Sequence, residues 1–229
     1  YEDENKILSN NYIWNFLKPW LSQKDAYLER KAIYTFRSTI ARKWRKGRIF
    51  IAGDAAHLMP PFMGQGMCAG IRDVSNLAWK ISLCIKNKHN EKFLDTYQSE
   101  RFSNVKEYIE TTMRMGEFVN AIGSDNITGN ISSGPDGSKS MQSIKPKIGF
   151  GLGSKTDKNR GKIFPQLKMK NGKILDNKFS TSPVLFLSSK LNKLKNLSKI
   201  PTVGEKEVIG LSNLLKKYKA KGIIVRPDR

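Results

Sequence analysis

The segment from Gly47 to Lys80 constrains the fold of this chain more than any other part. It reads GRIFIAGDAAHLMPPFMGQGMCAGIRDVSNLAWK, a short apolar run followed by a Gly-Asp pair, a loop rich in proline and glycine, and a helical pattern. The apolar run, residues 48–52, favours a short strand buried on both faces. A loop that leaves a buried strand and enters a helix amino terminus forms a ligand-binding corner with unpaired N–H groups. The segment therefore predicts a site for an electron-rich ligand.

The residue types in this loop suit a flat ligand that carries hydroxyl groups. Gly53 permits a tight turn and close approach, and the Asp54 carboxylate, which only accepts hydrogen bonds, suits sugar hydroxyls rather than phosphate. Pro61 stiffens the loop, while Gly64 and Gly66 leave main-chain N–H groups accessible. Gly-Asp followed by prolines could by itself be a simple tight loop, but the full ordered pattern favours a binding site.

Periodic apolar residues predict the other regular elements. Spacings of three and four predict long helices over residues 67–85 and 94–121. A shorter helix is predicted over residues 11–21, with Pro19 near its end. Alternating side chains over residues 32–41 favour an extended strand.

The second half of the chain has a different character. Residues 123–162 are rich in Gly, Ser, Asn, Asp and Lys without a sustained period, and we interpret them as a linker. Beyond them, the apolar runs PVLFLSS and GIIVRPDR, an Asn-Gly turn at 171–172 and a Leu/Lys-rich stretch at 188–199 mix strand and helix signals. Residues 163–229 therefore predict a second, small α/β unit.

The strong positive charge raises the question of nucleic acid. The formal charge is +21, from 41 Lys and Arg against 20 Asp and Glu. Most of the excess follows residue 139 as scattered lysines, without an aromatic stripe or an RNA-binding signature. Solvated lysine faces explain this better than a specific nucleic-acid site. A basic nucleic-acid-binding fragment, or a non-catalytic interaction fragment, stays open as the alternative.

Cysteine usage and hydropathy bound the cellular setting. Cys68 and Cys84 lie 16 positions apart on one predicted helix, too far along it for a disulfide or a zinc site. No apolar run reaches the roughly 18 residues that span a bilayer, and the opening YEDENK carries no signal pattern. We expect a cytoplasmic protein without membrane or metal. Since the first residue is Tyr1, we also expect the chain to begin partway through a longer protein.

The segment from Gly53 to Lys80 resembles the second flavin-binding motif of class A flavoprotein monooxygenases. FLKPWL, YTFRSTIARKW leading into GRIFIAGD, and the terminal IIVRPDR are similar to the 3-(3-hydroxyphenyl)propionate hydroxylase and phenol hydroxylase branch of that family. The implied fold class is α/β, with a partial FAD-binding domain followed by a thioredoxin-like domain. The implied divisions are a remnant of the substrate-binding layer (1–46), the carboxyl-terminal part of the FAD-binding domain (47–122), the linker (123–162) and the thioredoxin-like domain (163–229).

The resemblance also implies roles for residues. Asp54, next to Gly53, would hydrogen-bond the ribityl or ribose hydroxyls of FAD, and Pro61 would line the flavin face where oxygen adds. The loop glycines Gly64 and Gly66 lead to the helix start, where the N–H groups of Met67 and Cys68 would face the pyrimidine edge of the flavin and stabilise negative charge on the reduced ring. The resemblance implies no catalytic side chain, since His57 is chiefly structural in this motif.

The implied activity is that of the whole family. NADH or NADPH reduces FAD, O2 reacts with the reduced flavin, and one oxygen atom is transferred to a small phenolic substrate. A homodimeric full-length enzyme is compatible with the family. The thioredoxin-like part has no C-x-x-C, so no redox role is expected for it.

One half of the family's cofactor site has no counterpart in the sequence. The family's strand, G-x-G-x-x-G and helix that hold the FAD pyrophosphate are missing, and the imitation at Gly149, Gly151 and Gly153 has no amphipathic helix after it. We interpret these glycines as loop and expect the chain, without the ADP-binding half, to bind FAD poorly.

Overall fold

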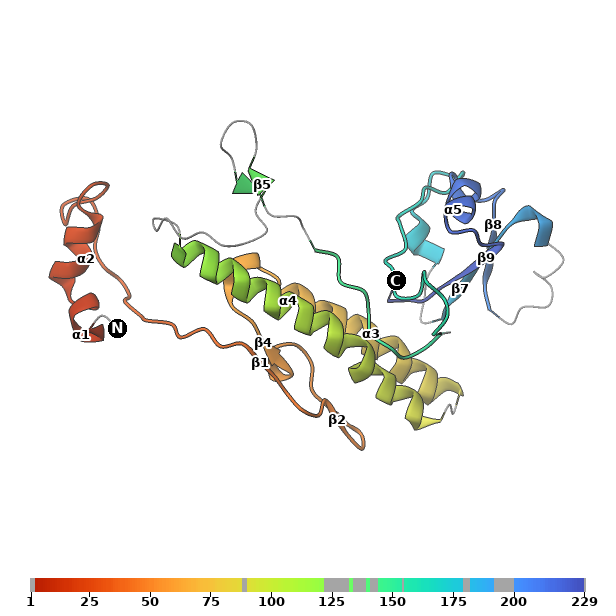
Figure 1. The fold of residues 1–229 in the computed structure, drawn as a ribbon, viewed down its shortest axis with the longest axis horizontal. Coiled ribbons are helices and arrows are strands. Elements are labelled where there is room, and N and C mark those ends of the chain that lie inside the picture. Colours follow the sequence, from red (N-terminus) through yellow and green to blue (C-terminus); the bar gives the residue numbers. More distant parts are fainter. Residues whose placement is uncertain are drawn as a thin grey trace. The chain divides into compact units, whose positions relative to one another are not determined.

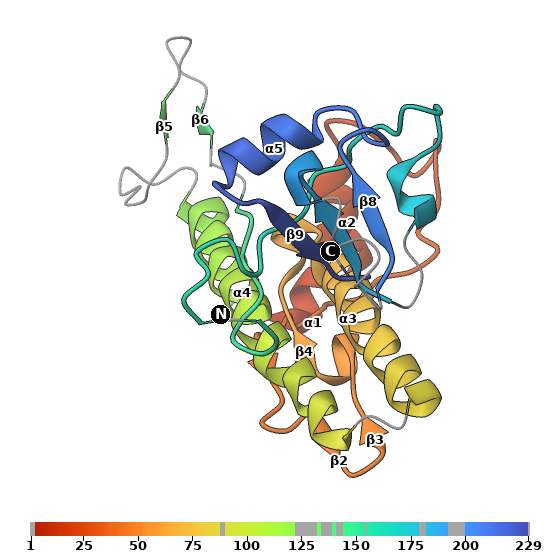
Figure 2. The same ribbon diagram turned by 90° about the vertical axis from the view of Figure 1, so that its right-hand side faces the viewer.

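The computed structural model describes residues 3–87, 90–121, 132–133, 139–140, 144–153, 155–178, 182–191 and 200–228 (Figures 1 and 2). The chain divides into two compact units, Tyr1–Arg37 and Ser38–Arg229, which are described separately. Within the described residues, no helix is long and apolar enough to cross a bilayer.

The first unit contains two short helices, α1 (Glu4–Ile7) and α2 (Asn10–Leu17). The Ser9 hydroxyl accepts a hydrogen bond from the Tyr12 N–H at 3.2 Å, which caps the start of α2. The helix predicted over residues 11–21 is therefore present but ends earlier, since Pro19 disfavours helical geometry in the residue before it and cannot donate a backbone hydrogen bond.

The strand predicted over residues 32–41 is wrong for most of its length. Only β1 (Thr39–Ile40) is a strand, and residues 31–38 have no regular structure. The side chains of Tyr34 and Phe36 are 64% and 56% exposed, so the alternation does not separate a buried face from a solvated one. A strand needs a neighbour for its N–H and C=O groups, and no described strand pairs with residues 31–38.

Two small antiparallel pairs open the second unit. β1 pairs with β4 (His57–Leu58), and β2 (Arg45–Lys46) pairs with β3 (Ile49–Phe50). The apolar run at 48–52 thus forms only the short strand β3. Its expected burial on both faces is also wrong, since Ile49 is 72% exposed and, among the described strands, β3 pairs only with β2.

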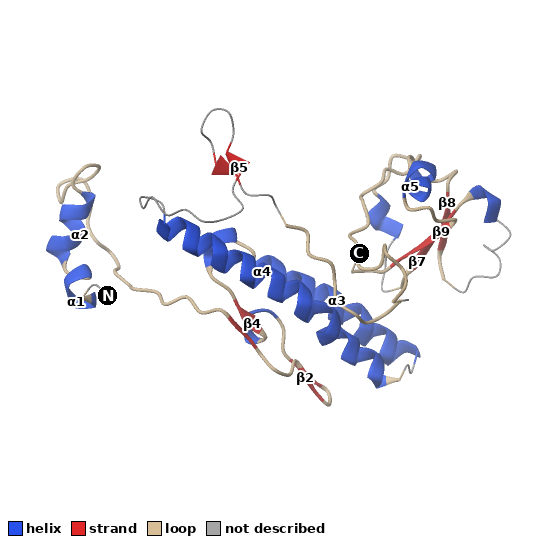
Figure 3. Ribbon diagram, in the orientation of Figure 1, coloured by secondary structure: helices blue, strands red, loops and turns tan. Residues whose placement is uncertain are grey.

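Two long helices dominate the second unit, as Figure 3 shows. α3 (Gly66–Asn87) and α4 (Thr96–Ala121) pack against each other, and both predicted helices are confirmed. The 3-10 helices η1 (Gly53–Ala55), η2 (Pro61–Met63) and η3 (Glu91–Asp95) flank them. The core beneath them contains Trp44, Ala56, Leu77, Tyr97, Val105 and Ile109.

The stretch interpreted as a linker is packed over its second half. The Gly149 N–H donates to the Glu100 carbonyl oxygen at 2.6 Å, and the Asn104 side-chain amide donates to the Pro146 carbonyl oxygen at 2.7 Å. A Cβ on Gly149 would lie 2.2 Å from the Ser99 carbonyl oxygen, so only glycine permits this approach to α4. Earlier in the stretch, β5 (Ser132–Ser133) and β6 (Lys139–Ser140) form an antiparallel pair.

The carboxyl-terminal residues form a small mixed sheet in the order β8-β7-β9. The central β7 (Val184–Leu187) pairs in parallel with β8 (Thr202–Gly204) and antiparallel with β9 (Gly222–Val225). Its separate core includes Phe164, Leu175, Phe186, Val203, Leu211 and Val225, with contributions from η4 (Leu175–Lys178) and α5 (Leu211–Lys217).

Two expectations for this carboxyl-terminal region are met. The turn at 171–172 is confirmed by Gly172 at φ +76° and by the bridge between Lys168 and Ile174. The region mixes helix and strand, in keeping with the predicted α/β class. Of the Leu/Lys-rich stretch at 188–199, residues 192–199 lie outside the described residues.

Candidate functional site

The Gly-Asp corner, defined here as residues 53–68, ends in the first turn of α3, and its Gly-Asp turn lies against the same helix. Gly53 adopts φ +58°, a left-handed conformation that glycine accepts without a Cβ clash. A Cβ added to Gly70 on α3 would lie 3.3 Å from the Gly53 Cα, so the two backbones are nearly in contact. The sequence pattern thus places a Gly-Asp turn beside the first turns of a long helix.

The structure brings the predicted site residues into this one corner. Gly53 and Asp54 lie in η1, Pro61 opens η2, and Gly64 ends η2 at φ +60°. The remaining predicted residues, Gly66, Met67 and Cys68, form the first turn of α3.

The corner contains polar groups that have no partner among the described residues. The Asp54 side chain is exposed, and its carboxylate has no hydrogen-bond or ion-pair partner in the described part of the chain. The first N–H groups of an α-helix lack acceptors within the helix. Those of Gly66, Met67 and Cys68 have no acceptor among the described residues, whereas the Ala69 N–H donates to the Gln65 carbonyl oxygen. The corner therefore offers a free carboxylate and a group of free N–H donors to a ligand.

The buried carboxylate of Asp73 binds the backbone of the corner. One oxygen of Asp73 accepts hydrogen bonds from the Gly53 N–H at 3.1 Å and lies 2.6 Å from His57 Nε2. The other accepts from Arg101 Nε at 2.8 Å. Burial raises the pKa of Asp73, but the hydrogen bond from His57 and the charge of Arg101 outweigh it, so the pKa is lowered. Asp73 therefore links the Gly-Asp turn to α3 and α4, and His57 Nε2 is occupied by its contact with Asp73.

The buried face of α3 is unusually polar. Asp73, Asn76 and Lys80 are each at most 1% exposed, while Ile71 and Val74 are 57% and 56% exposed. The apolar residues whose spacing predicted this helix are thus not all buried. The reason is that Asp73, Asn76 and Lys80 each have a buried polar or charged partner.

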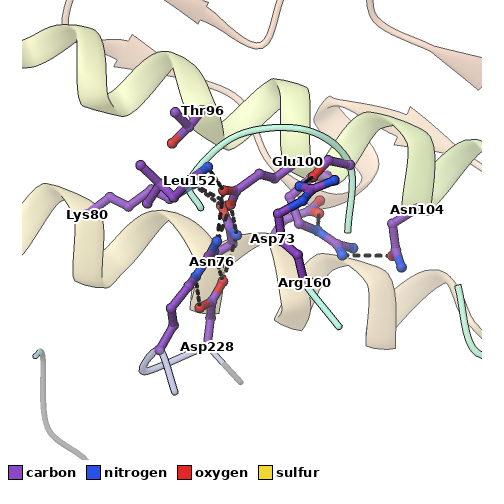
Figure 4. Close-up of polar contacts among 12 residues, drawn as sticks. Asp73, Asn76, Lys80, Thr96, Glu100, Asn104, Leu152, Arg160 and Asp228 are labelled. Atoms are coloured by element: carbon purple, nitrogen blue, oxygen red, sulfur yellow. Dashed lines mark hydrogen bonds and ion pairs between the residues drawn. The ribbon is translucent and has the colours of Figure 1, made fainter. Parts of the chain in front are cut away.

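A second buried carboxylate joins α3, α4 and the carboxyl terminus (Figure 4). Glu100 accepts hydrogen bonds from Lys80 Nζ at 2.8 Å and from Arg226 Nη1 and Nη2 at 2.8 and 2.7 Å. It also accepts from the Asn76 side-chain amide at 2.9 Å and the Leu152 N–H at 2.8 Å. Burial raises the pKa of Glu100, but the hydrogen bonds and charge of Arg226 and the charge of Lys80 lower it to about 2.

Lys80 itself has a shifted pKa. Burial lowers the pKa of its amine to about 8, against the opposing effect of Glu100. The sequence analysis did not identify Asp73, Lys80, Glu100 and Arg101 as buried. The only sign of their burial in the sequence is that these charged residues lie among the regularly spaced apolar residues of two helices. No described group of three or more His, Cys, Asp or Glu side chains could hold a metal ion.

Comparison with known proteins finds similarity in the part of the chain that contains the corner. Residues 21–112 match the FAD binding domain family. Over 111 residues the chain is 45% identical to a probable NADH-specific resorcinol 4-hydroxylase of Rhodococcus jostii, covering 48% of this chain and 21% of that protein. Over 119 residues it is 35% identical to a 3-(3-hydroxy-phenyl)propionate/3-hydroxycinnamic acid hydroxylase of Mycolicibacterium smegmatis, covering 52% and 21%.

Solved structures share the fold at lower identity. A complex of aklavinone-11 hydroxylase with FAD and aklavinone matches with a TM-score of 0.55 and 20% identity, over 82% of this chain and 40% of that one. The rebeccamycin biosynthetic enzyme RebC with reduced flavin matches with a TM-score of 0.57 and 18% identity, over 83% and 42%. The chain spans about a fifth of the length of the Rhodococcus and Mycolicibacterium relatives.

Proposed function

We propose that this chain, which resembles FAD-dependent aromatic hydroxylases, is the carboxyl-terminal, flavin-contacting part of a monooxygenase that hydroxylates a phenolic ring. The observation that carries the proposal is the free Asp54 carboxylate beside the free N–H groups at the start of α3. These groups lie within the residues that match the FAD binding domain family.

The chemistry of the corner fits FAD. The Asp54 carboxylate suits the ribityl or ribose hydroxyls of the cofactor, since it can only accept hydrogen bonds. Exposed Pro61 would line the flavin face, and the N–H groups of Met67 and Cys68 would donate to the pyrimidine edge. When bound, FAD would take electrons from NADH or NADPH and use O2 to place one oxygen atom on the phenol, the other leaving as water.

The protein's own contribution is positioning and charge stabilisation. Asp73 fixes the Gly53 N–H, so the turn that carries Asp54 is held in place before any ligand arrives. The amino end of α3 has a partial positive charge, which favours negative charge on a reduced flavin ring. Both effects support a preorganised cofactor site.

The other half of the cofactor site would come from an ADP-binding part with a G-x-G-x-x-G motif. The exposed apolar residues Met67, Ile71 and Val74 on α3 support this, because a helix face of this kind is usually covered in a complete domain. NADH is the reductant named for the Rhodococcus relative, and either nicotinamide nucleotide fits this proposal.

The sequence-based domain divisions remain proposals. Residues 1–46 would belong to a substrate-binding layer and residues 47–122 to the FAD-binding domain, with residues 123–162 joining them to the last domain. A thioredoxin-like domain over residues 163–229 is supported by the mixed sheet with β7 at its centre. A dimeric full-length enzyme and a cytoplasmic location stay expectations from the resemblance and the sequence.

The first test is an FAD titration of the 229-residue chain. We expect weak binding and a colourless protein after gel filtration, since the chain supplies only part of the contacts. Stoichiometric flavin that stays bound through gel filtration would contradict the proposed division of the site.

The second test replaces Asp54 in a full-length protein that joins this chain to an ADP-binding part. Asp54→Ala removes one or two charge-assisted hydrogen bonds of about 1.5–3 kcal/mol each, so the Kd for FAD should rise by roughly ten-fold to ten-thousand-fold. Saturating FAD should restore much of the turnover. Glu110→Ala, at an exposed position on α4, is the matched control and should leave the Kd unchanged. Equal FAD affinity in the two variants would make Asp54 a simple loop residue.

A further inference from the structure

A cavity of about 960 Å³ lies in the second unit, outside the Gly-Asp corner. Its walls come from α3, α4, the packed stretch that follows residue 144, and the carboxyl-terminal sheet, and none of residues 53–68 lines it. Its size is within the range of about 300–1,000 Å³ found for small-molecule sites.

Three side chains that line the cavity each have one nitrogen donor without an acceptor in the described part of the chain. These donors are Nη1 of Arg72, Nη2 of Arg101 and Nε1 of Trp79, and all three atoms are buried. Arg101 is 2% exposed, and its other nitrogens are used, Nε by Asp73 and Nη1 by Asn104. A buried donor without an acceptor is costly, so the arrangement calls for acceptor atoms from outside the chain.

The charge on the walls is positive in excess. Arg101 is paired with Asp73, and Arg226 is paired with Glu100 and Asp228. Arg72 instead contacts the Gln65 amide oxygen at 3.1 Å and the Tyr108 ring at 5.0 Å.

Two further cations on the walls also bind neutral groups. Arg160 donates to the Gly149 carbonyl oxygen at 2.7 Å, and Lys162 donates to the Asn159 side-chain oxygen at 2.7 Å. Among the described residues, Arg72, Arg160 and Lys162 thus form no ion pair. One wall carboxylate, Asp157, also has no cation partner in the described chain and accepts from the Asn159 N–H, so the excess charge on the walls stays positive and favours an anion.

Apart from these cations and a few Asn and Asp side chains, much of the wall is apolar or aromatic. This part includes Leu83, Phe93, Tyr108, Ile148, Phe164 and Ile223. A bare inorganic anion would leave this surface in contact with water, whereas a ligand with an apolar body would cover it. Guanidinium groups present parallel N–H donors that match the geometry of a carboxylate.

We propose that this cavity binds an organic carboxylate with a flat or apolar body, at a site separate from the flavin corner. The carboxylate accepts hydrogen bonds from Arg72 and Arg101, and the body lies among the aromatic walls beside Trp79. The proposal does not depend on FAD.

The test uses 2-naphthoate as the probe and its neutral analogue 2-naphthamide as the comparison, each titrated into the 229-residue chain by ligand-observed NMR. We expect saturable binding of 2-naphthoate that is about tenfold or more tighter than that of 2-naphthamide, since only the carboxylate makes charge-assisted bonds. Equal affinity of the two probes, or no saturable binding to a chain that is folded by circular dichroism, overturns the proposal.

Variants locate the binding. Arg72→Gln should weaken 2-naphthoate binding about tenfold, while Arg114→Gln, at an exposed arginine of α4 that does not line the cavity, should not change it. If Arg72→Gln fails to fold, Arg160→Gln provides the same comparison. Trp79→Phe should abolish the change in tryptophan emission on binding. Unchanged affinity in the folded arginine variants, or an unchanged emission response in Trp79→Phe, places the probe elsewhere and overturns the proposal.

Discussion

Replacing Glu100 by glutamine should destabilise the second unit by about 3–5 kcal/mol, the cost of breaking a buried ion pair from one side. The Glu100 side chain is 0% exposed, as is that of its partner Lys80. Glutamine keeps the size of the side chain but removes the negative charge. Arg226 keeps Asp228 as a partner, so most of the cost falls on Lys80, whose buried ammonium loses its only ion-pair partner among the described residues.

The lowered pKa of Glu100 points in the same direction. A pKa of about 2, against the usual 4.5, means that the fold stabilises the ionised form. At about 1.4 kcal/mol for each pKa unit, this corresponds to roughly 3 kcal/mol, close to the lower end of the first figure. Solvent screens this carboxylate little, because its side chain is completely buried.

Urea unfolding followed by circular dichroism measures the effect. Glu110→Gln is the matched control, on the same helix, because Glu110 is 51% exposed and lies 3.7 Å from Lys106 in an i,i+4 pair. That pair should contribute only about 0.3–0.5 kcal/mol. Adding Lys80→Met to Glu100→Gln should recover part of the loss, since no unpaired ammonium remains. If Glu100→Gln costs no more than Glu110→Gln, the buried network does not stabilise the fold.

Three other outcomes follow from the same structure. Because the pKa of Glu100 is lowered, its contribution to stability is complete above pH 4.5 and is lost as the pH falls toward 2. The stability of Glu100→Gln should therefore fall less with acid than that of the parent, and an equal fall in an acid titration would contradict this. Gly116→Ala should lower the stability by about 1–3 kcal/mol in thermal melts, since its Cβ would lie 2.5 Å from the Phe62 ring. Adding Phe62→Ala should recover most of this loss, and no recovery would show that the clash with Phe62 is not its cause. Tyr97→Phe should lower the free energy of unfolding in urea by about 1–2 kcal/mol, since the Tyr97 hydroxyl donates to the Ile51 carbonyl oxygen at 3.1 Å. An unchanged stability would show that water takes the place of the hydroxyl at that carbonyl.

The sequence by itself determined the local elements. The helices α3 and α4 follow from apolar spacing, because a helix of more than twenty residues repeats its period often enough to be distinctive. The turn at Gly172 follows from the Asn-Gly pair. The Gly-Asp corner could also be predicted, because its glycines, prolines and helix start act through backbone conformation over a short stretch of chain.

The tertiary structure decided which faces are buried and which strands form. Residues 31–38 alternate as a strand does, yet they stay irregular because pairing requires a neighbouring strand that the pattern cannot supply. The polar face of α3 is buried because partners distant in sequence reach it: Glu100 contacts Asn76 and Lys80, and Asp228 contacts Asn76. Local periodicity records only the polarity of each residue, whereas the cost of burying a charge depends on partners that folding brings together.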